Sequence, residues 1–119
     1  MKRNQQIFYL TLTLLWMALI FWLSSIPDLK SSLPSWQDFV LRKLAHATEY
    51  AILYILWLKS LGASKKRMLI AAAISLVYAM TDEFHQGFVH DRVASPIDVL
   101  IDSGGVLIGY VLMYKKTRH

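Results

Sequence analysis

The acidic residues of this 119-residue chain gather in three short stretches of an otherwise apolar sequence. All eight carboxylates lie within residues 28–38, at residue 49, or within residues 82–102. Six of them accompany His46, Gln86 and Arg92 at the ends of apolar segments: Glu49, Asp82, Glu83, Asp91, Asp98 and Asp102. Because a charge in hydrocarbon is costly unless a partner or water reaches it, several charges at one depth predict a polar site inside a membrane.

Side chains of these types could transfer protons or hold a ligand. His46 and Glu83 are candidates for a general acid and base, because imidazole and carboxyl groups exchange protons readily. The full set of candidate catalytic residues is His46, Glu49, Asp82, Glu83, Gln86, Asp98 and Asp102. The same oxygens and imidazole could bind zinc or a hard divalent cation, although their spacing matches no compact metal motif, and the sequence identifies no cofactor. The simpler alternative is a network of ion pairs, since charges inside a membrane must be paired in any case.

Lys43 and Arg92 are the candidate substrate-binding residues. The planar guanidinium group of Arg92 suits a phosphate or a carboxylate, and Lys43 lies one helical turn before His46. Their simpler roles are contact with lipid head groups and neutralisation of an acid.

Composition predicts which elements must position these residues. With 55% hydrophobic residues and a mean hydropathy of +0.39, the chain is too apolar for an ordinary soluble domain. Four segments, residues 7–25, 40–60, 68–89 and 96–114, approach the ~20 residues that a helix needs to cross a bilayer. We therefore expect an all-α polytopic membrane protein with four transmembrane helices, forming one domain over residues 1–119. The first segment lacks a small-residue cleavage site and is expected to remain as an anchor.

Two other classes of protein are disfavoured. The chain has no cysteine, which excludes disulfides and thiolate chemistry. Its net charge of +5 could suggest nucleic acid, but the basic residues cluster at the ends of segments and form no stripe along a polar helix. We expect no nucleic-acid partner.

The distribution of basic residues predicts the orientation in the membrane. Nine of them would share one side of a four-span chain without any acid: Lys2, Arg3, Lys59, Lys65, Lys66, Arg67, Lys115, Lys116 and Arg118. Because basic residues prefer cytoplasmic loops, both termini are predicted to be cytoplasmic. The polar ends of spans two, three and four would then meet in the outer half of the membrane.

Helical spacing supports a common site. Asp98, Asp102, Gly105 and Gly109 recur every three or four residues and therefore share one face of a helix. The two glycines also form a small-x-x-x-small pattern, which allows two helices to approach closely. Lys43, His46 and Tyr50 form a comparable stripe with Glu49 beside it, and Gln86 can share a face with Asp82 or Glu83.

At these residues the chain resembles the VanZ-like family of small bacterial membrane proteins. The resemblance rests on Ser24-Ser-Ile-Pro27, Lys43-Leu-Ala-His-Ala-Thr-Glu-Tyr50, Asp82-Glu-Phe-His-Gln86, Arg92, Asp98 and the segment 102–109. The chain differs at His90-Asp91, where the family commonly has Pro-Gly, and at Asp102, where it often has Asn. The resemblance implies a multi-pass protein of the bacterial inner membrane, with a role in lipoglycopeptide (teicoplanin-type) resistance or another process of the cell envelope.

Three functions remain open at this point. The first is an enzyme that acts on a lipid or a lipid-linked cell-wall component through an outward-facing polar site. The second is a non-catalytic protein that binds or shields such a component, or binds the lipoglycopeptide itself. The third is a proton-coupled carrier, for which four short spans leave little room unless protomers assemble. Membrane lipids are expected partners in each case, and the sequence does not determine the oligomeric state.

Overall fold

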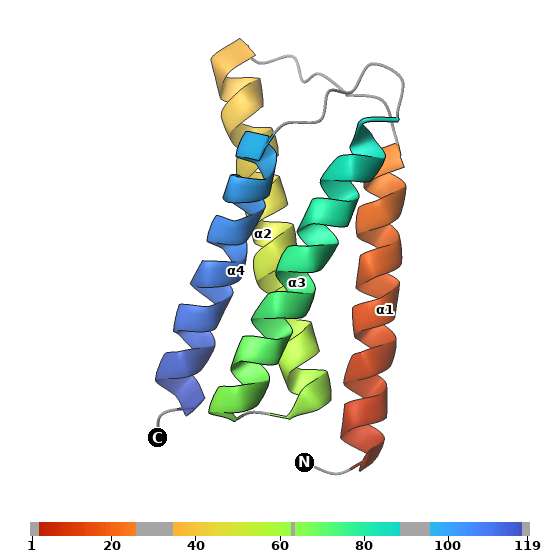
Figure 1. The fold of residues 1–119 in the computed structure, drawn as a ribbon, viewed down its shortest axis with the longest axis vertical. Helices are drawn as coiled ribbons and strands as arrows, with labels where there is room; N and C mark the ends of the chain where they lie inside the picture. The colour runs from red at the N-terminus through yellow and green to blue at the C-terminus, as the bar shows by residue number, and fades with distance from the viewer. Residues whose placement is uncertain (1–2, 26–34, 63, 89–95, 118–119) are drawn as a thin grey trace.

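Four helices make up the structure, which is a computed structural model that describes residues 3–25, 35–62, 64–88 and 96–117. They are α1 (Arg3–Ser25), α2 (Ser35–Leu61), α3 (Lys65–Gln86) and α4 (Pro96–Thr117). The helices lie side by side along one axis, and the two ends of the chain lie at the same end of the bundle (Figure 1). The predicted all-α fold is confirmed.

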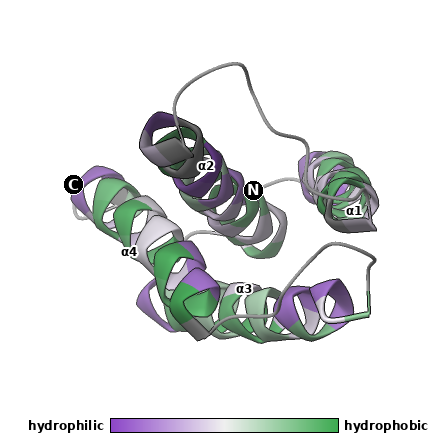
Figure 2. Ribbon diagram, turned by 90° about the horizontal axis from the view of Figure 1, so that it is seen from above, coloured by the Kyte–Doolittle hydropathy of each residue, from purple (hydrophilic) through white to green (hydrophobic). Residues whose placement is uncertain are grey.

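The inner helices of the bundle are α2 and α3. Each of them contacts all three other helices, whereas α1 and α4 make no contact with each other within the described residues. The view from above shows α1 and α4 on opposite sides of the bundle (Figure 2). The bundle is 45 Å long, and this matches the ~40–45 Å of a bilayer with its head groups.

Three helices are long and apolar enough to cross a membrane, namely α1, α3 and α4. The predicted second span is not among them, because α2 carries Arg42, Lys43, His46 and Glu49 within residues 42–49 and Lys59 near its end. Its interior face is nevertheless the centre of the bundle. Tyr50, Leu53, Tyr54 and Leu58 of α2 are completely buried. The other three helices therefore cover this face of α2, so that its placement in the bundle depends on packing and not on its own hydropathy.

The outside of the bundle is apolar on every helix. Large hydrophobic side chains are exposed along α1, α2, α3 and α4, with Leu15, Leu44, Leu69 and Leu107 each about 60% exposed. In water such a continuous apolar surface would promote aggregation, whereas lipid chains cover it at no cost. The buried positions include both apolar residues and the charged Asp82, Glu83 and Asp102, whereas the exposed surface carries large apolar residues on every helix, as in a membrane bundle.

Local chemistry sets the ends of the central helices. Gly62 follows α2 with φ +98°, a left-handed conformation that favours glycine, and its N–H donates to Leu58 O at 2.8 Å. Ser64 then begins α3 by accepting a hydrogen bond from Arg67 N at 3.2 Å. At its other end α3 stops at Gln86, three residues before the predicted end. There the N–H of Gly87 is shared between Glu83 O and Phe84 O, so the last turn tightens.

The glycine stripe of α4 packs directly on α2. A Cβ atom added to Gly105 would overlap the backbone carbonyl of Ala47, and one added to Gly109 would lie 3.0 Å from Ala51 O. Gly104, the neighbouring residue, has open space around the same position. The predicted close approach along Gly105 and Gly109 is confirmed, and it holds the polar ends of α2 and α4 together.

We predict that Gly105→Ala destabilises the bundle and that Gly104→Ala does not. The added methyl group at residue 105 must push α4 away from the rigid backbone of α2, at a cost of about 1–3 kcal/mol. The measurement is the thermal stability of both variants purified in detergent. Equal melting temperatures for the two variants would contradict this packing.

Candidate functional site

Polar side chains from α2, α3 and α4 converge at the end of the bundle opposite the termini. We call the five carboxylates there the acid site: Glu49, Asp82, Glu83, Asp98 and Asp102. Asp82, Glu83 and Asp102 are between 2% and 6% exposed, and Gln86 is buried to the same degree. Asp102 lies within electrostatic range of the other four carboxylates. The five carboxylates therefore lie together at one end of the bundle, and Asp82, Glu83 and Asp102 are the members that are buried in it.

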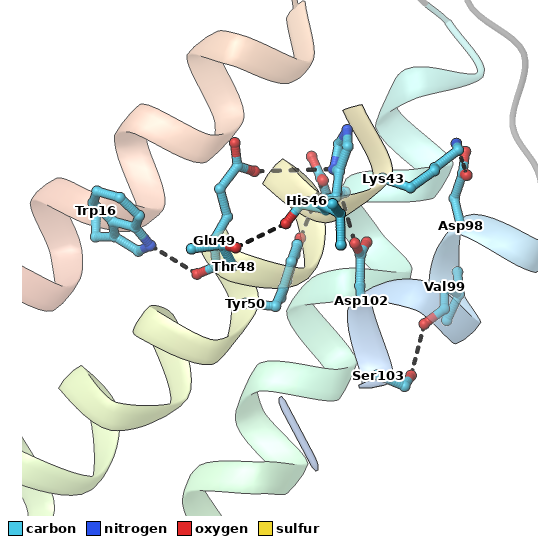
Figure 3. Close-up of polar contacts among 12 residues, drawn as sticks. Trp16, Lys43, His46, Thr48, Glu49, Tyr50, Asp98, Val99, Asp102 and Ser103 are labelled. Carbon is cyan, nitrogen blue, oxygen red and sulfur yellow. Dashed lines mark hydrogen bonds and ion pairs between the residues drawn. The ribbon is translucent and has the colours of Figure 1, made fainter. Parts of the chain in front are cut away.

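An ion pair joins α2 to α4 at the outer edge of the acid site. Lys43 Nζ donates to Asp98 Oδ1, and both side chains are partly exposed (Figure 3). The pair neutralises one of the five carboxylates. It also occupies Lys43, so an incoming phosphate or carboxylate would compete with Asp98 for this cation.

His46 lies between two carboxylates one turn deeper (Figure 3). Its Nδ1 atom is 3.9 Å from Glu49 Oε2 and 3.8 Å from Asp102 Oδ1. Both distances are longer than a hydrogen bond. They are still short enough for the protonated imidazole to attract either carboxylate. A small movement or a bridging water would allow proton transfer between His46 and either acid. This arrangement suits both an acid–base pair and a binding site.

The deepest contact of the acid site joins α2 to α3. The hydroxyl of Tyr50, which is completely buried, donates to Asp82 Oδ2 at 3.0 Å. A buried carboxylate is costly without such a donor, and this bond stabilises Asp82 in place. Tyr50 belongs to the stripe of Lys43 and His46, but it was not among the candidate site residues. Its hydroxyl group and its position on that stripe could have identified Tyr50 as a site residue from the sequence.

Helix α1 is linked to the site by two hydrogen bonds from aromatic side chains to backbone carbonyls. The indole N–H of Trp16 donates to the backbone carbonyl of Glu49 at 2.9 Å (Figure 3). In addition, the hydroxyl of Tyr78 on α3 donates to Met17 O at 2.6 Å. These contacts fix α1 beside the acid site. Sequence reasoning missed Trp16, because nothing in an apolar segment indicates which backbone carbonyl a distant indole will reach.

A second polar contact connects α1 and α3 near the same end. The imidazole of His85 stacks on Phe21 with ring centroids 4.2 Å apart, and its Nε2 atom is 2.9 Å from Ser25 Oγ. Since Ser25 Oγ also lies 2.9 Å from Phe21 O, which can only accept, this carbonyl competes with the imidazole for the serine proton. His85 is partly exposed, and through these contacts it links α3 to α1.

Two sequence predictions are left without structural support. Arg92 lies outside the described residues, so its position relative to the acid site stays a prediction. Within the described part of the chain, no three His, Asp or Glu side chains are arranged to hold a metal ion. The metal alternative therefore stays a prediction, as does the position of Arg92.

The sequence matches the model of one protein family over almost its whole length. The match is to VanZ/LLP1 and covers residues 7–116, which include all four helix cores and the acid site. The chain belongs to the VanZ-like family. Together with the three apolar helices, this membership identifies a membrane protein. Comparison with curated proteins and with solved structures found no match.

We predict that Tyr50→Phe destabilises the protein by about 1–3 kcal/mol, because Asp82 loses its donor while the packing of the ring is kept. Tyr9→Phe is the matched control. Tyr9 lies at the other end of the bundle, where its ring contacts Lys59 Nζ at 5.2 Å, and that contact does not need the hydroxyl. Thermal unfolding in detergent measures both changes. A Tyr50→Phe protein as stable as the control would show that the bond to Asp82 contributes little.

Proposed function

We propose that this chain is a multi-pass protein of the cell membrane with four spans, cytoplasmic termini and an acid site that opens to the outer leaflet. The support for α2 as a span is its central packing between three apolar helices. The support for the orientation is charge. Within the described residues, the end that carries the termini has basic residues and no acid: Arg3, Lys59, Lys65, Lys66, Arg67, Lys115 and Lys116.

The orientation predicts the result of a labelling experiment. The natural chain has no cysteine, so single cysteines can be introduced at Asp91, between α3 and α4, and at Lys66, at the start of α3. A thiol reagent that cannot cross membranes should label Asp91→Cys in whole cells and should label Lys66→Cys only after the cells are opened. Labelling of Lys66→Cys in intact cells would show that the orientation is the opposite one, with the acid site on the cytoplasmic side.

For the activity, we propose that the acid site holds the head group of a lipid or a lipid-linked cell-wall component, and that this interaction protects the cell from lipoglycopeptide antibiotics of the teicoplanin type. The observation that carries the proposal is the convergence of five carboxylates from three helices at one end of a bundle whose outside is apolar. Burying ionisable groups in this way is expensive, and such groups in membrane helices usually mark a functional site. Membership of the VanZ-like family supports the link to the cell envelope.

Catalysis and shielding are two ways in which the site could act. In catalysis, His46 and Glu83 would move protons during a reaction of the bound lipid, with the remaining acids and Gln86 positioning it. In shielding, the bound component would be withheld from the antibiotic without chemical change. The distances of 3.9 and 3.8 Å from His46 Nδ1 to Glu49 and Asp102 support either mode, because they place this nitrogen near two acids. Conversion of a labelled lipid extract by the purified protein distinguishes catalysis from saturable binding alone.

We predict that His46→Ala and Glu83→Gln each abolish protection against a lipoglycopeptide while the amount of protein in the membrane stays unchanged. His46→Ala removes the imidazole, and Glu83→Gln removes a negative charge while keeping the shape of the side chain. Thr48→Ala is the matched control, because Thr48 is exposed on α2 and its hydroxyl donates to Leu44 O of the same helix. The measurement is the minimal inhibitory concentration in a sensitive host that expresses each variant. Full protection by both site variants would show that protection does not depend on the acid site.

A further inference from the structure

We infer that the end of the bundle that carries the termini has a binding site for an anionic phospholipid, formed by α1, α2 and α3. Its residues are Arg3, Lys59 and Arg67 with the amide of Gln6, and we call this group the basic corner. It lies at the turn from α2 to α3, at the end of the bundle opposite the acid site (Figure 1). This lipid site is independent of the acid site, and the proposed orientation places it in the cytoplasmic leaflet.

The turn after α2 brings side chains of α1 and α3 together. Gln6 Nε2 on α1 donates to the backbone carbonyl of Leu61, the last residue of α2, at 3.4 Å. The guanidinium group of Arg67 on α3 lies over Gly62. A Cβ atom added to this glycine would be 2.8 Å from Arg67 Nη1 and 3.7 Å from Gln6 Nε2. The guanidinium group and the amide group therefore lie on the same turn.

The last turn of α2 and the first turn of α1 supply the other two cations. Lys59 Nζ lies 5.2 Å from the centroid of the Tyr9 ring on α1, whose π face attracts the ammonium group. Arg3, Gln6 and Tyr9 follow one another at intervals of three residues, so they share one face of α1. Gln6 therefore has a cation about one turn away on either side.

The described residues contain no acid that could neutralise these three cations. The sequence has no Asp or Glu within residues 1–27, 50–81 or 103–119, and the described carboxylates of the acid site lie at the opposite end of the bundle. Like charges that share a small region repel one another, so an anion that binds among them lowers the electrostatic energy. The basic corner therefore favours a negatively charged ligand.

The donors of the basic corner suit a phosphodiester group. Arg67 is exposed, and its planar guanidinium can donate two parallel N–H bonds to the two free oxygens of a phosphodiester. Lys59 adds a compact positive charge that needs no fixed geometry. The amide nitrogen of Gln6 carries two hydrogens, of which Leu61 O accepts one. The second hydrogen can go to the ligand.

The surface beside the basic corner favours a lipid over free phosphate. Ile7 lies one turn after Arg3 on α1 and is 52% exposed, and Ile70 lies one turn after Arg67 on α3 and is 40% exposed. Acyl chains can cover these side chains while the phosphate of the same lipid reaches the cations. The ends of a bundle 45 Å long also lie at the level of the lipid head groups. Free phosphate lacks the apolar contact.

The test measures lipid binding to the purified full-length protein in detergent by native mass spectrometry. The probes are phosphatidylglycerol, which carries a net negative charge, phosphatidylcholine with the same acyl chains, which carries none, and inorganic phosphate. Since one basic residue strengthens binding to an anionic surface about fivefold, we expect phosphatidylglycerol to bind at least about tenfold more tightly than phosphatidylcholine. Inorganic phosphate at the same concentration as the lipid should not displace it.

Matched pairs of substitutions make the test specific. Lys59→Gln and Arg67→Gln should each weaken binding of phosphatidylglycerol about fivefold, and the double variant should weaken it more than about tenfold. The control is the double variant Lys115→Gln and Lys116→Gln. It removes the same charge at the same end of the bundle, but from α4, which makes no contact with α1 within the described residues. The control should bind as the natural protein does. Melting temperatures identify any variant that does not fold, and Lys59→Gln tests the site if Arg67→Gln is unstable.

Three results would overturn the inference. Equal binding of the two lipids would show that charge does not select the ligand. Equal losses in the two double variants would show a diffuse attraction to the whole basic end and no local site. Displacement by inorganic phosphate would identify a small anion as the ligand. None of these results affects the proposed function, because protection that depends on His46 and Glu83 is measured separately.

Discussion

The structure depends on the high cost of placing charged side chains in hydrocarbon. Helix α2 carries Arg42, Lys43, His46 and Glu49 within residues 42–49, and it is also the helix with the most completely buried interior residues. Its polar groups are stabilised inside the bundle by partners from other helices. Lys43 pairs with Asp98 of α4, and Tyr50 donates to Asp82 of α3. Forming the bundle and forming the acid site are therefore one event, because neither α2 nor the acids would be stable alone in lipid.

Close packing of the backbone makes this pairing possible. Gly105 of α4 lies against the carbonyl of Ala47, and Ala47 is the residue after His46. A larger residue at position 105 would separate α2 from α4 where the imidazole approaches Asp102. On the other side, Trp16 and Tyr78 fix α1 through hydrogen bonds to backbone carbonyls. Small residues thus set the distance between helices, and aromatic donors hold the remaining helix at the correct depth.

The electrostatics of the site follow from its composition and from its burial. Within the described residues the acid site holds five carboxylates, of which Asp82, Glu83 and Asp102 are buried where water is scarce and charges interact strongly. Such a site can attract a cation or a proton, and it can change its charge when a ligand binds.

The sequence by itself determined the helical class, the approximate helix bounds, the close-packing glycines and the set of polar residues, because each depends on local composition and on a period of 3.6 residues. It could not determine that α2 would be central, that Tyr50 would donate to Asp82, or that Trp16 would reach Glu49 from α1. Those contacts join residues 32 and 33 positions apart, so they depend on how the helices rotate and pack against one another. The tertiary structure alone decided which charges are paired, and Asp102 shows the difference. Its helix face was predictable from spacing, whereas the unbonded oxygen beside His46 was not.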